Sequence, residues 1–199
     1  MRRKPKSESV RPHLLTAKIG EITQGTVFSC INVPRYEGSN TYGLVITARC
    51  DIAQDKYPVL NYVPVVPLDS WLRLDGLRFL ISAEQKNLLG KVRNLLNQQN
   101  ISNSITLSVS REEIAQIHFA IDAPKRADRD RAKKFASLIK EIRDFEEITE
   151  SGERESAYAW FVEHRQSDVQ HIISRLSKHE VTGYYFFEEL VSDVDDDPY

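Results

Sequence analysis

The densest set of reactive side chains in this sequence lies between residues 47 and 56, directly after an apolar, strand-like run. Thr47, Arg49, Cys50 and Asp51 offer a hydroxyl, a guanidinium, a thiol and a carboxylate. Metal-independent RNA cleavage needs a base for the 2′-hydroxyl, an acid for the leaving oxygen and a cation for the phosphate. Asp51 or Asp55 can serve as the base, and Arg49 or Lys56 as the cation. The structural interpretation is a strand end, where Asp51 caps a turn and pairs with Arg49.

A second candidate site is the basic segment at residues 125–134, where the pattern predicts the start of a helix. Its basic residues are Lys125, Arg126, Arg129, Arg131, Lys133 and Lys134. At helical spacing Arg126, Arg129 and Lys133 share one side, so they can follow a nucleic-acid backbone without reading its sequence. Acidic residues are interleaved among them, and a solvated helix start is the structural alternative.

The sequence predicts neither a metal site nor a cofactor. Its histidines are scattered and form no i,i+4 pair, the spacing typical of helical metal ligands; they are His13, His118, His164, His171 and His179. Cys30 and Cys50 are too few for a disulfide framework or a zinc cluster. There is no glycine-rich nucleotide-binding motif.

Overall composition indicates a globular, cytoplasmic protein. The chain has 199 residues and a formal net charge of −2, so no global positive field marks it as a nucleic-acid binder. No apolar run is long enough for a membrane span. The charge is uneven, because residues 1–18 form a basic arm and residues 188–199 an acidic tail.

The first half of the chain predicts β structure. Segments rich in β-branched and aromatic residues occur at 25–33, 42–48 and 59–68. Residues 101–109 can form one further strand, and the four aromatics Tyr184 to Phe187 predict a strand near 183–188 that closes the sheet. Short strands at this spacing indicate a small, strongly bent barrel of five or six strands.

The second half predicts helices that pack around the barrel. Ser82 with Gln85 and Ser110 with Glu113 each fit a capping box that opens a helix. Apolar stripes predict two more helices, one from about Asp128 and one, the longest, over 155–178. The fold class is therefore α+β, a single domain over 19–187 with a barrel core at about 20–72 and a helical extension at about 82–178.

The three strand-like segments together resemble the small SH3-like barrel of the MazF/PemK toxin family, whose members cleave mRNA. The resemblance covers about residues 20–72 and rests on Gly25-Thr26-Val27-Phe28, Gly43-Leu44-Val45-Ile46-Thr47 and Val63-Pro64-Val65-Val66-Pro67-Leu68. It implies that Ser70 stands at the position of the family's hydroxyl. The family's arginine before the second strand is missing, since Thr41-Tyr42-Gly43 occupies that place. Arg35, in the preceding loop, is a candidate substitute.

We therefore expect a non-catalytic interaction module, an accessory subunit of a prokaryotic toxin–antitoxin or phage-defence assembly that docks on a larger protein. One alternative is a metal-independent endoribonuclease that uses Arg49, Asp51 and Ser70, with Arg35 as substitute cation. Another is a single-stranded nucleic-acid binder that uses the 125–134 face and the aromatic strand. RNA or DNA is thus a further candidate partner, and a homodimer a further candidate assembly.

Overall fold

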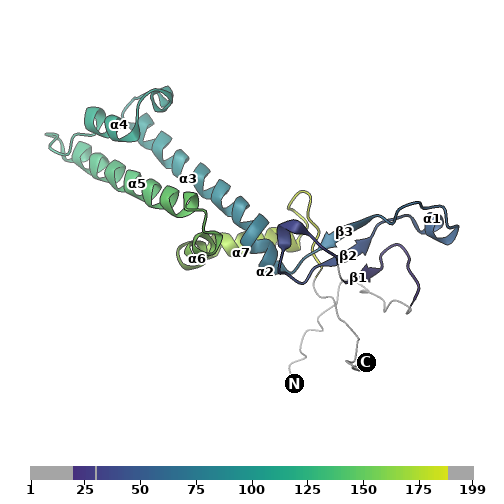
Figure 1. The fold of residues 1–199 in the computed structure, drawn as a ribbon. Coiled ribbons are helices and arrows are strands. Elements are labelled where there is room, and N and C mark those ends of the chain that lie inside the picture. The colour runs from purple at the N-terminus through teal and green to yellow at the C-terminus, as the bar shows by residue number, and fades with distance from the viewer. Residues whose placement is uncertain (1–19, 30, 188–199) are drawn as a thin grey trace, which may run out of the picture. The chain divides into compact units, whose positions relative to one another are not determined.

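The computed structural model describes residues 20–29 and 31–187 (Figure 1). The described residues divide into two compact units, one formed by residues 20–67 (without residue 30) with residues 175–187 and the other by Leu68–Ser174. We call them the first and the second unit and describe each by itself. Among the described residues, no helix has both the length and the apolar character needed to cross a membrane.

The first unit contains a three-stranded antiparallel sheet in the order β1-β2-β3. Its elements are β1 (Val27–Phe28), the 3₁₀ helix η1 (Pro34–Tyr36), β2 (Tyr42–Val45), the one-turn helix α1 (Arg49–Ala53) and β3 (Tyr62–Val65). The strands are shorter than the sequence predicts, because their ends pass into turns. Thr47 fixes the end of β2, since its Oγ accepts a hydrogen bond from Asn61 N at 2.7 Å.

A close aromatic contact covers one residue of the central strand of this sheet. Phe28 pairs with Gly43 across β1 and β2, and its ring covers the glycine. The ring also meets Tyr62 of β3 edge to face, with the centroids 5.3 Å apart. A Cβ at Gly43 would lie 2.5 Å from Phe28 Cζ, so only glycine leaves room for the ring.

Two of the predicted strands are wrong. Residues 101–109 contain the 3₁₀ helix η3 (Asn103–Leu107), whose N-cap Ser102 accepts from Ser104 N. Residues 184–187 form no strand, because Phe186 N donates to the His179 side chain and Tyr184 N to Val181 O, so these amides are used locally. The described part of the chain is thus a mixed α and β fold with an open three-stranded sheet, and closure into a barrel is not shown.

The second unit is helical. Its elements are α2 (Leu68–Trp71), the π-helical turn η2 (Leu72–Gly76), α3 (Leu77–Gln98), η3, α4 (Arg111–His118), α5 (Arg126–Glu150), α6 (Arg154–His164) and the larger part of α7 (Gln166–Ser177). The first three follow one another without a break, so helical structure begins at Leu68. The capping box predicted at Ser82 is wrong, because buried Leu77 and Leu80 extend the apolar stripe toward the N-terminus.

The core of the second unit lies between α3, α4 and α5. The two long helices, α3 and α5, run side by side in opposite directions (Figure 1). Its buried residues repeat at helical spacing and include Leu88, Val92, Leu96, Ile114, Phe135, Leu138 and Ile142. The capping box predicted at Ser110 is confirmed: Ser110 N donates to Glu113 Oε2 at 3.0 Å, and Glu113 N to Ser110 Oγ at 3.3 Å.

The long helix predicted over 155–178 is wrong, because it is interrupted at Arg165. This residue has φ −137° and ψ 39°, so α6 ends there and α7 begins immediately after it. The interruption needs no glycine or proline. Arg165, at the interruption, makes side-chain contacts with residues that lie far away in the sequence. The longest described helix is instead α5, whose predicted start near Asp128 and end before Gly152 are confirmed.

The surroundings of Gly43 and of Gly90 predict opposite effects on stability when each glycine is replaced by alanine. Gly43→Ala should destabilise the sheet by about 1–3 kcal/mol, because the added methyl collides with the ring. Gly90→Ala should stabilise α3 by up to about 1 kcal/mol, since no atom lies within 4 Å of its Cβ position and alanine favours helix. Amide hydrogen exchange in β2 and α3 measures both changes. Unchanged protection of β2 in Gly43→Ala would contradict this packing.

Candidate functional site

The residues of the predicted endoribonuclease site lie in three different elements. Arg49 and Asp51 lie in the one-turn helix α1, not at a strand end, and both are exposed. No ion pair joins Arg49 to Asp51 within the described residues; Asp51 accepts from Cys50 Sγ at 3.7 Å instead. Arg35 lies in η1 of the same unit, and Ser70 lies in α2 of the second unit.

The basic segment at 125–134 is partly neutralised by local contacts. Arg129 donates to Ala123 O at 2.7 Å and Pro124 O at 2.9 Å, Arg131 pairs with Asp128, and Arg126 lies 3.9 Å from Asp130. Lys125, Lys133 and Lys134 are exposed. Arg126 is exposed as well, with 90% of its side chain accessible, so the segment presents three lysines and one arginine to solvent, whereas Arg129 and Arg131 make contacts at the start of α5. Within the described residues, no group of three acidic, histidine or cysteine side chains is placed to hold a metal ion.

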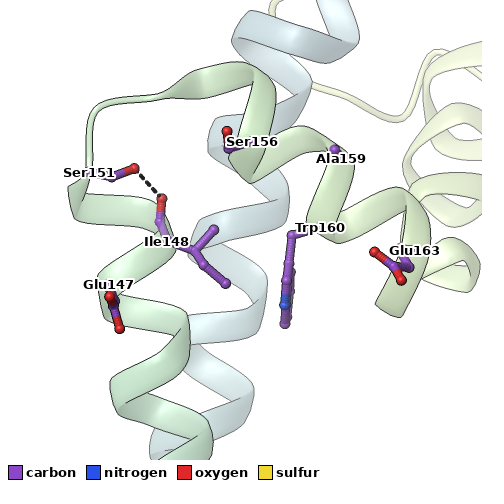
Figure 2. A pocket seen from close by; sticks show the side chains of 7 residues that line it. All are labelled: Glu147, Ile148, Ser151, Ser156, Ala159, Trp160 and Glu163. Atoms are coloured by element: carbon purple, nitrogen blue, oxygen red, sulfur yellow. Dashed lines mark hydrogen bonds between the residues drawn. The ribbon is translucent and has the colours of Figure 1, made fainter.

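An open groove lies between α5 and α6 in the second unit (Figure 2). It has a volume of about 420 Å³ and is lined by Glu147, Ile148, Ser151, Ser156, Ala159, Trp160 and Glu163. Apolar and aromatic groups form its floor, and two carboxylates stand at its sides. Lysine and arginine do not occur in this lining, so the groove is electronegative.

The turn between α5 and α6 sets the shape of the groove. Ser151 is the C-cap of α5, and its Oγ donates to Ile148 O at 2.9 Å. Gly152 follows with φ 77°, the left-handed conformation that commonly ends a helix. Ser156 Oγ then donates to Glu153 Oε2 at 3.0 Å in the first turn of α6. These local bonds close the last turn of α5 and the first turn of α6, on either side of the turn that joins the two helices.

Trp160 is held in place by a cluster of rings. Phe145 lies 5.6 Å from its ring centroid and Phe161 lies 5.1 Å away at an interplanar angle of 89°. His164 stacks on the indole at 5.2 Å, and its Nδ1 lies 3.1 Å from Trp160 O. The indole stands between Ile148 and Glu163, with Glu147 farther along the groove (Figure 2). A fixed, half-exposed indole is a low-entropy contact surface for a ligand.

The two carboxylates of the groove have few partners of their own. Within the described residues Glu147 forms no ion pair, and Glu163 has only His164, at 3.9 Å. Both lie near helix ends where the macrodipole favours cations, and the last turn of α5 carries no basic residue. This arrangement is unfavourable for the isolated helices, and its field would attract a positively charged group.

Behind the groove, Arg165 connects three helices through acidic side chains. It donates to Glu84 of α3 from Nε at 3.2 Å and from Nη2 at 2.8 Å, and to Glu141 of α5 from Nη2 at 3.0 Å. Lys91 also donates to Glu141 Oε1 at 3.0 Å, and Asn87 to Glu84 Oε2 at 3.0 Å. The Arg165 guanidinium lies 5.4 Å from the Trp160 ring centroid, so the network supports the indole.

Glu84 is the most deeply buried charged residue of this network, because only 4% of it is exposed. Desolvation is the largest single influence and raises the pKa of its carboxyl. The hydrogen bonds from Arg165 and Asn87 and the charges of Arg165 and Lys91 together outweigh it, so the pKa lies below its ordinary value of 4.5. Glu84 is therefore ionised and paired in the folded chain.

Sequence reasoning did not identify the groove. Its members are dispersed between residues 147 and 163 and match no catalytic motif. One signal was present: acidic residues crowd the C-terminal turns of the predicted helix before Gly152, where basic residues would be expected.

We expect Arg165→Ala to lower the free energy of unfolding of the second unit by about 2–4 kcal/mol, because it leaves a buried carboxylate uncompensated. Glu84→Gln in that background should recover about 1 kcal/mol or more, since the charge is then removed. Urea denaturation followed by tryptophan fluorescence measures this unit, which contains both tryptophans. The control Arg143→Ala, which breaks an exposed pair with Glu112, should cost less than about 1 kcal/mol. A similar loss of unfolding free energy in Arg165→Ala and Arg143→Ala would contradict the role of Arg165.

The lowered pKa of Glu84 predicts a dependence of stability on pH. A carboxyl whose pKa is lower in the folded state contributes stability that is present above its unfolded pKa, and this contribution is lost as pH falls through the folded pKa. Between about pH 6 and pH 3 the urea midpoint should therefore fall more steeply in the wild type than in Glu84→Gln. Parallel curves for the two proteins would contradict this assignment.

Comparison with protein-family models, curated proteins and solved structures finds no match to this chain. The resemblance of residues 20–72 to the MazF/PemK family therefore stays a prediction. The function is argued below from the residues of the groove and their surroundings.

Proposed function

We propose that this chain is a non-catalytic interaction module that binds a positively charged segment of a protein partner in the groove between α5 and α6. The observation that carries the proposal is the electronegative lining of the groove, in which Glu163 lies beside Trp160, Glu147 lies farther along, and no lysine or arginine occurs. A cation in the groove would lie in the field of these carboxylates and near an aromatic ring.

The energies of these contacts suit a reversible partner. An exposed ion pair contributes about 0.2–1 kcal/mol and a cation over an exposed indole about 0.5–1 kcal/mol. The groove alone would thus hold one cationic side chain weakly, and the surrounding segment would add the rest of the affinity. Charge on the rim would chiefly speed association and select the partner.

The biological setting that we propose is an accessory subunit of a prokaryotic toxin–antitoxin or phage-defence assembly in the cytoplasm. It follows from the resemblance of residues 20–72 to the MazF/PemK family, in which the arginine before the second strand is missing here. The same resemblance predicts that the sheet of the first unit belongs to a small closed barrel. A non-catalytic role agrees with the exposed positions of Arg49 and Asp51 in α1.

The proposal predicts saturable binding of a fluorescein-labelled peptide in which glycine alternates with arginine and lysine. Fluorescence anisotropy at low salt should show that Glu147→Gln with Glu163→Gln weakens binding by about fivefold or more. Glu150→Gln removes an exposed acid of the same helix outside the lining, and it should change the affinity by less than about twofold.

Two results would contradict this function. Equal losses of peptide affinity in the double variant and in Glu150→Gln would mean that binding depends only on the overall charge of α5. Cleavage of labelled RNA by the wild type, lost in both Arg49→Ala and Asp51→Ala, would support an endoribonuclease instead.

A further inference from the structure

The strand β3 leaves one edge of the three-stranded sheet without a neighbouring strand among the described residues. Tyr62 of this strand lies opposite Val45 of β2. Val45 uses both of its backbone groups on the β1 side, because its N donates to Thr26 O at 2.9 Å and its O accepts from Gly25 N at 2.9 Å. In an antiparallel pair, opposite residues either exchange hydrogen bonds or both face away. The N–H and C=O of Tyr62 therefore point to the open edge.

The direction of the backbone groups alternates along β3. Asn61 faces β2, because its O accepts from Ile46 N at 2.9 Å. By the same alternation, Pro64 directs its C=O to the open edge beside Tyr62, and proline has no N–H to offer there. On the other side of Tyr62, the N–H of Leu60 forms no hydrogen bond within the described residues.

The side chains of this edge are apolar and lack the charges that usually protect an edge strand. Residues 57–68 contain no Asp, Glu, Lys or Arg. Val59 is 65% exposed, Tyr62 45% and Val63 39%. Tyr62 and Val63 are successive residues of a strand, so they point to opposite faces of the sheet. Natural proteins usually block such an edge with charges, bulges or proline, and here only Pro64 does so, at one position.

We infer that this edge binds the same edge of a second copy of the chain, antiparallel and with the two-fold axis at Tyr62. The two Tyr62 residues then lie opposite each other and exchange N–H to C=O hydrogen bonds. The Leu60 N–H of each copy meets the Pro64 C=O of the other, so the N–H that proline lacks is not needed. The two three-stranded sheets thereby join into one continuous sheet.

Pro64 is the reason for choosing a second copy in this register. With Pro64 at the axis, its carbonyl would face the same carbonyl of the other copy, and neither would have a donor. With Tyr62 at the axis, the donors and acceptors of the edge are self-complementary, which a two-fold contact between identical chains requires. No charge in residues 57–68 is repelled by its own copy.

This inference is separate from the groove between α5 and α6. A cationic partner segment would find no carboxylate in residues 57–68. Closure of the sheet into a barrel within one chain would cover the same edge, so barrel closure and this dimer exclude each other.

The test is sedimentation velocity of the full chain over a range of concentrations. The wild type should form a dimer, and Tyr62→Lys and Tyr62→Glu should each weaken it at least about tenfold, because like charges then face each other across the axis. An equal mixture of the two variants should recover the dimer to within about threefold of the wild type, since lysine then lies opposite glutamate. Gln54→Lys, at an exposed position of α1 outside the edge, should change dimerisation by less than about threefold.

A monomeric wild type at every concentration would overturn the inference. Variants that dimerise alone as well as the wild type, or a mixture that stays monomeric, would also overturn it. Amide hydrogen exchange on the wild type supplies a second readout that needs no variant. The Tyr62 amide should become protected only as the dimer forms. Equal protection of this amide in the monomer would mean that a strand of the same chain covers the edge, and it would overturn the inference in favour of a closed barrel.

Discussion

The ion pair between Glu84 and Arg165 is the constraint on which the second unit depends. Glu84 is a nearly buried carboxylate in a helix that otherwise buries apolar side chains. Leaving such a charge unpaired costs several kcal/mol, so the chain must bring a cation to it. Arg165 supplies this cation, and it is also the residue at which the backbone leaves the helical conformation. The break between α6 and α7 therefore coincides with the residue that makes the contact.

The position of the candidate groove follows from the same contact. Because Arg165 also pairs with Glu141, α6 is tied to α5 near its C-terminal half as well as to α3. The turn at Gly152 fixes the other end of α6. Between these two attachments the indole of Trp160 is partly exposed. Glu146 at the end of α5 pairs with Arg111, whereas Glu147 forms no ion pair within the described residues. A structural network thereby supports a surface that has the properties of a binding site.

Local patterns predicted the elements that depend on neighbouring residues. The capping box at Ser110 and the apolar stripe of α5 are of this kind, and both are confirmed. The interruption at Arg165 was not predicted, because no local sequence signal marks it and the partner of Arg165, Glu84, lies 81 residues earlier in the sequence. The aromatic run at 184–187 failed for a related reason, since strand propensity alone does not supply a neighbouring strand. The groove was missed because its acids and its ring become a site only after α5 and α6 pack together.

The most direct test of the groove is a nuclear Overhauser experiment on the chain with a saturating concentration of the peptide in which glycine alternates with arginine and lysine. Spectra of Trp160→Phe identify which indole signals belong to Trp160. The account predicts contacts between the Trp160 indole protons and the arginine side-chain methylenes, and their disappearance when Glu147 and Glu163 are both replaced by glutamine. Contacts of the bound peptide with other residues, and none with Trp160, would contradict it.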